Sequence, residues 1–449
     1  MKRRLLAQLT VIMALAGCVQ QQAMRAVPSL ESPALRQINS KIQHVVIIFQ
    51  ENRSVDNLFN GLAGADTVQS GKNSKGYVIK LRPTPLTAPY DLSHRHDAYA
   101  VEYANGNLNG FDLVNSTCRS RKNCPPKGLR AYGFVPQYEV QPYFTMARQY
   151  AFADRMFQTN QGPSFPAHQY ILSGTSTISP GSSLRAAENP KTPSGKFTGG
   201  CNSPRGTLGS LIDQNGHENQ SAFPCFDRPS LTDLIDAKAL TWHYYQAHDK
   251  AGLWNGPDAI LHVRKNHHEY KMDVVAPPSQ ILADIAAGQL ANVAWVTPTL
   301  AASDHAGNTD GSGPSWVASV VNAIGKSQYW NDTAIFVTWD DWGGWYDHVK
   351  PLHYNSYELG FRVPLIAISP YAKTGFVSHK QHEFGSILKF VEETFGLGSL
   401  GTTDVRADDL SDCFNFGQAP RRFTIIPAPR GAAYFLHQPA SDDGPDDDY

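Results

Sequence analysis

The stretch HVVIIFQEN (residues 44–52) sets an uninterrupted apolar run directly against polar and acidic side chains. An apolar run without alternation is typical of a strand buried on both faces, as in a parallel sheet with helices on each side. Ligands of such sheets bind beyond the carboxyl ends of the strands. Glu51 and Asn52, which follow the run, are therefore expected at a functional edge of the sheet.

A second stretch, TAIFVTWDD (residues 333–341), repeats this pattern and ends on two adjacent acids. Asp340 and Asp341 would repel each other if both were ionised and partly buried, and a bound cation would explain them. The alternative is a solvated acidic turn. Together with Glu51 and Asn52 they form an oxygen-only ligand set, which suits one divalent ion such as Mg²⁺, Ca²⁺ or Mn²⁺ without deciding between them.

Further apolar runs alternate with helical patterns along the chain. Residues 292–299 and 363–370 are expected to form short buried strands like the first. Residues 315–327 and 383–396 have the apolar spacing of helices, and the second of them ends at a glycine. This succession predicts right-handed crossovers and an α/β fold with a mostly parallel central sheet and helices on both faces.

The composition is that of a globular protein, with 41% hydrophobic and 18% charged residues among 449 and a formal net charge of −1. One large domain is expected, and a net charge near zero argues against a nucleic-acid partner. Residues 70–127 and 179–227 are rich in Gly, Pro, Ser and Asn. We expect these segments to be insertions at the functional end of the sheet, held by disulfides because they lack a core of their own.

The N-terminus, MKRRLLAQLTVIMALAGC, places three basic residues before an apolar run that is too short to cross a bilayer. This arrangement predicts an export signal over residues 1–17. Its LAGC ending resembles the lipobox of bacterial lipoproteins, which implies lipid attachment to Cys18 and a polar tether over residues 18–40; a plain secretory signal is the alternative. Val19, in place of an aspartate, favours the outer membrane, and we expect the chain there, in the periplasm or at the cell surface.

Export makes disulfides feasible, and the remaining cysteines pair by proximity. Cys118 is expected to bond with Cys124, and Cys201 with Cys225, which leaves Cys413 over. A cysteine metal cluster is a weak alternative because the sequence has no Cys-x-x-Cys spacing.

The segment TNQGPSFPAHQYILSGTS (residues 159–176) combines a forced turn with a helical pattern. Gly162 and Pro163 make the turn, and the apolar spacing after Pro166 predicts a helix that begins almost at once. The hydroxyl of Ser164 would face the amides at the start of this helix, where phosphate binds well. The alternative makes Ser164 a simple helix cap.

Four blocks of the sequence resemble the signatures of a known family, in the order in which that family has them. They are HVVIIFQENRSVDNLF, GPSFP with SGTS, TWDDWGGWYDHV and GFRVPLIAISPYAKTGFV. The resemblance covers about residues 42–416 and is to the phosphoesterase family of bacterial and plant phospholipases C and related acid phosphatases. It implies a fold similar to that of alkaline phosphatases and sulfatases, with a metal site at the strand ends.

The resemblance also assigns roles to residues of this chain. Glu51, Asn52, Asp340 and Asp341 would bind the metal, and Ser164 would be both the nucleophile and a ligand. The chain departs from the family pattern in two places. Val55 stands where Phe is usual, and PAH (residues 166–168) replaces PNR, a change that would alter contacts with the leaving group.

Three histidines match family positions, namely His94 in DLSH, His305 in SDH and His348 in YDH. A histidine beside the phosphoryl group can stabilise its oxygens or protonate the leaving alcohol. His348 could equally support the turn that carries the two aspartates. His96 competes with His94 for its role, and which histidine is the general acid stays open.

These features predict a metal-dependent hydrolase that acts on phosphate esters through a phosphoseryl intermediate. The expected catalytic domain covers residues 41–430 and is followed only by an acidic tail over residues 431–449. Larger bacterial phospholipases C of the family carry extra C-terminal domains, so an acid phosphatase-like enzyme is favoured. A phospholipase C that cleaves phospholipid head groups is the first alternative, and an inactive surface-binding lipoprotein is the second. The expected partners are a phosphomonoester or phospholipid substrate and, through the lipid anchor, a membrane; no protein partner is evident.

Overall fold

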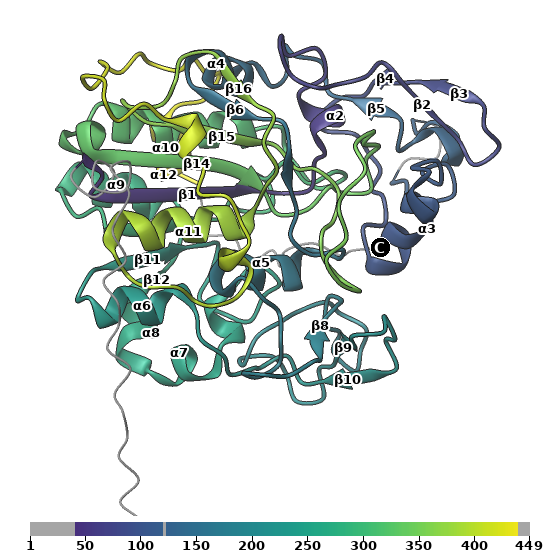
Figure 1. Cartoon of the computed structure of the whole chain (residues 1–449), viewed down its shortest axis with the longest axis horizontal. Helices are drawn as coiled ribbons and strands as arrows, with labels where there is room; N and C mark the ends of the chain where they lie inside the picture. Colours follow the sequence, from purple (N-terminus) through teal and green to yellow (C-terminus); the bar gives the residue numbers. More distant parts are fainter. Residues whose placement is uncertain (1–40, 120–122, 439–449) are drawn as a thin grey trace, which may run out of the picture.

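The computed structural model describes residues 41–119 and 123–438 of the chain (Figure 1). The expected signal peptide, the lipidation site Cys18, the tether and the end of the acidic tail lie outside these residues. Within the described ranges, no helix has the length and apolar character that a membrane span requires.

The core of the fold is an eight-stranded sheet. Its strands, from one edge to the other, are β12 (Val274–Val275), β11 (Trp242–Tyr245), β13 (Val293–Val296), β1 (His44–Gln50), β14 (Thr333–Trp339), β15 (Leu365–Ile368), β6 (Ala151–Ala153) and β16 (Phe376–Ser378). All neighbouring strands are parallel except that β15 runs antiparallel to both β14 and β6. The predicted mostly parallel α/β sheet is confirmed, and only the direction of β15 differs from the expectation.

Helices cover both faces of this sheet. Phe336 of β14 contacts Phe390 of α11 (Phe384–Phe395), and Trp339 of the same strand contacts Tyr143 of α4 (Gln141–Gln149). Since side chains alternate along a strand, residues three apart point to opposite faces. The two helices therefore lie on opposite sides of the sheet, as Figure 1 shows.

The other long helices join one of these two layers. Helix α10 (Gly313–Gly325) packs against α4, α9 (Gln280–Ala287) and α12 (Ala432–Leu436), while α5 (Ser164–Ser173) packs against α11 and α6 (Leu231–Ala237). The predicted helices over 315–327 and 383–396 correspond to α10 and α11. The remaining α-helices among the described residues are α2 (Val55–Leu58), α3 (His96–Tyr103), α7 (Leu261–Lys265) and α8 (His267–Asp273).

Small sheets form in the two insertions, which lie at the right in Figure 1, beyond the ends of the central strands. The first insertion holds β2 (Ser70–Lys72), β3 (Val78–Lys80) and β4 (Arg82–Pro83), which pairs with β5 (Gly133–Phe134). The second holds β8 (Arg185–Ala186), β9 (Gly209–Ile212) and β10 (Gln220–Ala222). A last pair, β7 (Met156–Phe157) and β17 (His382–Glu383), lies at the strand ends of β6 and β16.

Both predicted disulfides, Cys118–Cys124 and Cys201–Cys225, are present, and Cys413 is a buried free thiol. The expectation that the insertions lack a core was wrong. The first packs residues such as Phe111 into a separate hydrophobic cluster, which Trp342 and other residues from distant parts of the chain complete. A second small cluster lies under the other insertion.

The C-terminal segment begins with a helix, α12, that packs against the rest of the fold. Phe435 of α12 is buried and packs edge-on against Trp316 of α10. The predicted tail over 431–449 therefore starts with a docked helix, and its acidic end lies outside the described residues.

Candidate metal and catalytic centre

The ends of β1 and β14 coincide, because Gln50 pairs with Trp339 in the register of these parallel neighbours. The next residues, Glu51 and Asn52 after β1 and Asp340 and Asp341 after β14, are all buried together. The backbone amide of Asn52 donates to Asp340 Oδ1 at 3.3 Å. The structure thus brings together the four residues expected to bind a metal.

A tight turn holds this arrangement. Asn52 adopts a left-handed conformation, with φ at 60°, which asparagine tolerates better than most residues. Gly343 has φ at 65°, and a Cβ at this position would lie 2.3 Å from the carbonyl oxygen of Asn52. Only glycine allows the two turns to approach this closely.

Helix α5 delivers two further side chains to Glu51. The hydroxyl of Ser164 donates to Glu51 Oε2 at 3.3 Å. Four residues later, one turn along the same helix, His168 Nε2 lies 3.2 Å from Glu51 Oε1 and 4.0 Å from Asp340 Oδ2. One ligand atom from each of Glu51, His168 and Asp340 lies within 4.8 Å of the others.

The tautomer of His168 follows from its other neighbour. Tyr244 donates its hydroxyl proton to the carbonyl of Trp254 at 2.7 Å, so it accepts from His168 Nδ1 at 3.0 Å. Burial lowers the pKa of His168 to about 4, although the charge of Asp340 opposes this shift. The ring is therefore neutral near pH 7, and its unprotonated Nε2 faces two carboxylates.

Electron-rich atoms that face one another in a buried space require a positive charge between them. Two of the oxygens here, Asn52 Oδ1 and Asp340 Oδ2, have no hydrogen-bond partner among the described residues. The residues present therefore fit a divalent cation. The imidazole adds a nitrogen to the expected oxygen-only set, which widens the fitting ions from Mg²⁺, Ca²⁺ and Mn²⁺ to borderline metals such as Zn²⁺.

Asp341 and His94 form the adjacent part of the site. The side-chain amide of Asn52 donates to both Asp341 oxygens, at 3.1 and 3.2 Å, and lies 3.0 Å from His94 Nε2. His94 Nδ1 donates to the carbonyl of Leu92 at 2.9 Å, so its Nε2 accepts from Asn52 when the ring is neutral. Asn52 thereby links the candidate metal ligands to a histidine from the first insertion.

His305 is buried beside His94, with ring centroids 5.7 Å apart. Its Nδ1 lies 2.8 Å from the carbonyl of Ala306, which places the proton of the neutral ring on Nδ1 and makes Nε2 the reactive nitrogen. The structure therefore brings two of the three expected catalytic histidines together.

His348 lies in a different cluster. Its ring nitrogens contact Asp56 at 2.6 Å and Asp66 at 3.1 Å. Burial disfavours its charge, but the hydrogen bond and charge of Asp56 outweigh this and raise the pKa of His348. These contacts place His348 beside α2 and Asp66, and the structure does not bring it to the other two histidines. His96 bonds to Glu218 of the second insertion at 2.5 Å.

The start of α5 offers less to a phosphate than expected. The amide of Phe165 already donates to Asn189 at 2.8 Å, and Pro166 has no amide hydrogen. The amide of Ser164 makes no hydrogen bond within the described chain. One backbone donor, rather than a cradle of several, therefore remains beside the Ser164 hydroxyl.

Arg53, which follows Asn52 directly, has a structural role. It is fully buried and donates to the carbonyls of Asp304 and Leu86 at 2.9 Å each and to Asn57 at 3.2 Å. These bonds tie the turn after β1 to the loop that carries His305.

His168 is the site residue that the sequence reasoning missed. It was noted only as a departure from the family pattern in PAH. A signal was available, because residues four apart on a helix share one face and His168 follows Ser164 by four positions.

Three comparisons relate the chain to known proteins. A sequence model described as the Phosphoesterase family matches residues 42–398. A non-hemolytic phospholipase C of Pseudomonas aeruginosa is 24% identical over 443 residues, which cover 84% of this chain and 57% of that protein. Non-specific phospholipase C1 of Arabidopsis thaliana is 23% identical, with 86% of this chain and 73% of that protein covered.

The chain spans only 57% to 64% of the length of three of its bacterial relatives, all phospholipases C. Among solved structures, a protein in the alkaline phosphatase superfamily from Vibrio parahaemolyticus aligns with a TM-score of 0.39 and 10% identity, covering 84% of this chain and 78% of the other.

Proposed function

The chain belongs to the Phosphoesterase family, and from this premise we propose that it is a metal-dependent hydrolase that cleaves phosphate esters through a phosphoserine at Ser164. The observation that carries the proposal is the convergence on Glu51. The Ser164 hydroxyl, the unprotonated Nε2 of His168 and a carboxylate oxygen of Asp340 all meet there in a buried site.

Glu51, Asn52, His168 and Asp340 would hold the cation, which when bound would neutralise charge on the phosphoryl oxygens and lower the pKa of the Ser164 hydroxyl. Asp341, also expected as a ligand, is left out of this set because both of its oxygens accept from the side-chain amide of Asn52. The remaining chemistry belongs to the side chains. Ser164 Oγ attacks phosphorus, and its proton passes to Glu51 Oε2, the atom to which the hydroxyl already donates.

The bond from phosphorus to the leaving oxygen breaks as the bond to Oγ forms, and the electron pair stays on the leaving oxygen. A histidine then supplies the proton that makes this oxygen an alcohol. We assign this donor to protonated His305 through Nε2, because Asn52 already engages Nε2 of His94. In the second step, water attacks the phosphoserine and gives a proton to the now neutral His305 at Nε2. The bond from phosphorus to Ser164 Oγ breaks as the bond to the water oxygen forms, and Oγ takes back the proton held by Glu51, so both groups return to their starting states.

A phosphomonoesterase of acid-phosphatase type and a phospholipase C-type diesterase use this same chemistry. The names of the relatives favour the diesterase as a second candidate. The test is hydrolysis of p-nitrophenyl phosphate beside p-nitrophenyl phosphorylcholine, with and without chelator. Preference for one substrate identifies the branch, while hydrolysis of neither would favour an inactive binding protein.

The serine variant tests the nucleophile directly. Ser164→Ala should abolish turnover, whereas Ser173→Ala, a buried serine at the other end of α5, should retain it. Radiolabelled phosphate on Ser164 in acid-quenched protein would identify the intermediate. Full activity of the Ser164→Ala variant would reject the mechanism.

We also propose that the chain is exported and lipidated at Cys18. The two disulfides support export, because such bonds persist in oxidising compartments. Metabolic labelling with a palmitate analogue in a bacterial host should mark the wild type and not the Cys18→Ser variant. Equal labelling of both would reject lipidation at Cys18, and with it the basis for the expected outer-membrane location.

A further inference from the structure

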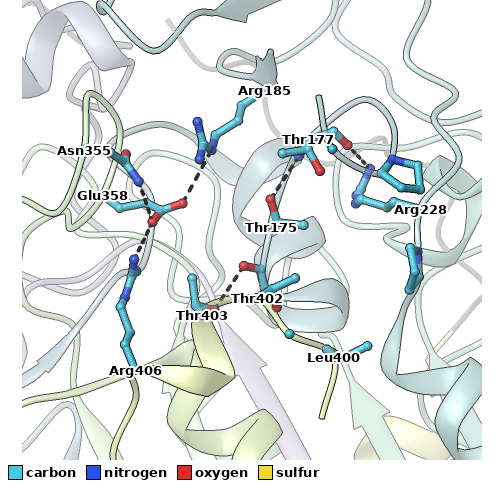
Figure 2. A pocket seen from close by; sticks show the side chains of 15 residues that line it. Thr175, Thr177, Arg185, Arg228, Asn355, Glu358, Leu400, Thr402, Thr403 and Arg406 are labelled. Atoms are coloured by element: carbon cyan, nitrogen blue, oxygen red, sulfur yellow. Dashed lines mark hydrogen bonds and ion pairs between the residues drawn. The ribbon is translucent and has the colours of Figure 1, made fainter. Parts of the chain in front are cut away.

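A cavity of about 430 Å³ lies at the end of α5 that is remote from Ser164 (Figure 2). Gly174, which ends the helix, lines it, so roughly 15 Å of helix separates the cavity from the proposed nucleophile. Small-molecule sites typically have ~300–1,000 Å³. Pro180, Gly181 and Gly401 at its rim are exposed, so solutes can enter from solvent.

Arg228 is the unusual residue of this cavity. Its side chain is only 2% exposed, yet its guanidinium bonds to neutral acceptors, the carbonyl of Thr177 at 3.0 Å and the side chain of Gln169 at 2.6 Å. Its Nε has no hydrogen-bond partner among the described residues. Burial lowers the pKa of Arg228 to about 9, although the charge of the neighbouring Asp227 opposes this shift.

Arg228 has no carboxylate among its hydrogen-bond partners, although other charges lie around the cavity. Arg406 bonds to Glu358 at 2.7 Å and to Glu383 at 2.8 and 2.9 Å. Arg185 has its Nε 3.6 Å from the same Glu358, as Figure 2 shows, without a hydrogen bond from that nitrogen. The neighbouring Asp227 acts on Arg228 through its charge alone, so the donors of Arg228 are left to neutral acceptors.

The C-terminal end of α5 would normally repel an anion, because its last carbonyls carry partial negative charge. Here threonine hydroxyls lie against them. Thr403 donates to the carbonyl of Gly174 at 3.0 Å, and the one proton of the Thr402 hydroxyl is shared between the carbonyl of Ser173 and Asp404 Oδ1, each at 3.0 Å. These hydrogen bonds reduce the repulsion between the helix end and an anion.

We propose that this cavity is a second, non-catalytic binding site for the phosphate group of a small polar molecule or of a lipid head group. Phosphate suits it better than carboxylate. Arg185 and Arg228 come from different segments and approach the cavity from different sides, and a tetrahedral group with several acceptor oxygens can bond to both. The proposal uses no residue of the catalytic centre and does not depend on the hydrolase proposal.

The test is calorimetric titration of the full, EDTA-treated chain with inorganic phosphate and with glycerol 3-phosphate. EDTA removes any cation that would hold phosphate at the catalytic centre. We expect saturable binding that weakens about tenfold or more in Arg228→Gln and in Arg185→Gln, the loss of one charge-assisted hydrogen bond. Arg148→Gln, an exposed arginine of α4, is the matched control and should bind as the wild type does.

Unchanged phosphate binding in both cavity variants would overturn the proposal, as would equally tight binding of acetate. If Arg228→Gln does not fold, Arg185→Gln decides alone, since its side chain is 20% exposed and leaves no sealed void. Flotation with phosphatidic acid vesicles, but not phosphatidylcholine vesicles, that is lost in the variants would support a lipid head group as the source. Binding limited to the soluble phosphates would support a free metabolite.

Discussion

Lowering the pH of the metal-free protein from 7.5 to 5 should destabilise it through His168. The pKa of this histidine is about 4 in the folded chain and 6.5 in an unfolded one. Between these values the unfolded state binds the proton and the folded state does not. The stabilising contribution of neutral His168 is therefore complete above pH 6.5 and is lost as the pH falls toward 4.

The magnitude follows from the two pKa values. A single site with these constants loses about 2 kcal/mol of unfolding free energy by pH 5 and about 3 kcal/mol by pH 4, relative to neutral pH. Carboxylates also titrate in this range, so the informative quantity is the difference between wild type and His168→Asn.

The measurement is urea unfolding in EDTA at several pH values, followed by tryptophan fluorescence. The wild-type curve should fall by about 2 kcal/mol more than that of His168→Asn between pH 7.5 and 5. His437→Asn removes an exposed histidine and should behave as the wild type. Parallel curves for the wild type and His168→Asn would refute the neutral tautomer and, with it, the reasoning that makes Nε2 a metal ligand.

Three further changes test residues that hold the fold around the site and its insertions. Gly343→Ala should cost at least ~1–2 kcal/mol from its positive φ alone, and more from the clash with the backbone of Asn52; kcat should fall with the melting temperature. Arg362→Met should cost about 3–5 kcal/mol in chemical denaturation, because it leaves buried carboxylates without their partner. Removing the disulfide at Cys201 should cost about 3.5 kcal/mol and that at Cys118 about 2.4, since the first closes the longer loop; equal shifts in melting temperature would contradict this order.

The strands that carry the site were predictable because both of their faces are buried. The apolar run over residues 333–339 has the same bounds as β14, and the run over residues 45–49 lies inside β1. The direction of β15 was not predictable, since an apolar run carries no information on strand polarity. β6 was not predicted, because its three residues are too few to show an apolar pattern.

Side chains outside the strand ends were harder to place. His348 follows Asp341 by only seven residues, but the two glycines of the turn send it to Asp56 instead. The first insertion appeared to lack a core because Trp342 and Trp345, which complete its cluster, come from more than two hundred residues downstream. In both cases contacts between residues far apart in the sequence determine where the side chains lie, and nearness in the sequence does not predict them.

A comparison of two buried clusters explains why we propose the metal at one and not at the other. Asp56 and Asp347 lie beside Arg362, which donates to both oxygens of Asp347 at 2.8 and 3.0 Å. The raised pKa of His348 keeps its ring charged to a higher pH than usual, so this cluster supplies its own cations.

The cluster at the ends of β1 and β14 uses the same residue types with the opposite electrostatics. Its histidine, His168, has a lowered pKa and brings a lone pair rather than a charge to Glu51 and Asp340. Both clusters contain two acids and a histidine within reach of one another, so residue identity alone does not separate them. The hydrogen bond from His168 to Tyr244 does, because it fixes the tautomer that leaves the carboxylates in need of an external cation.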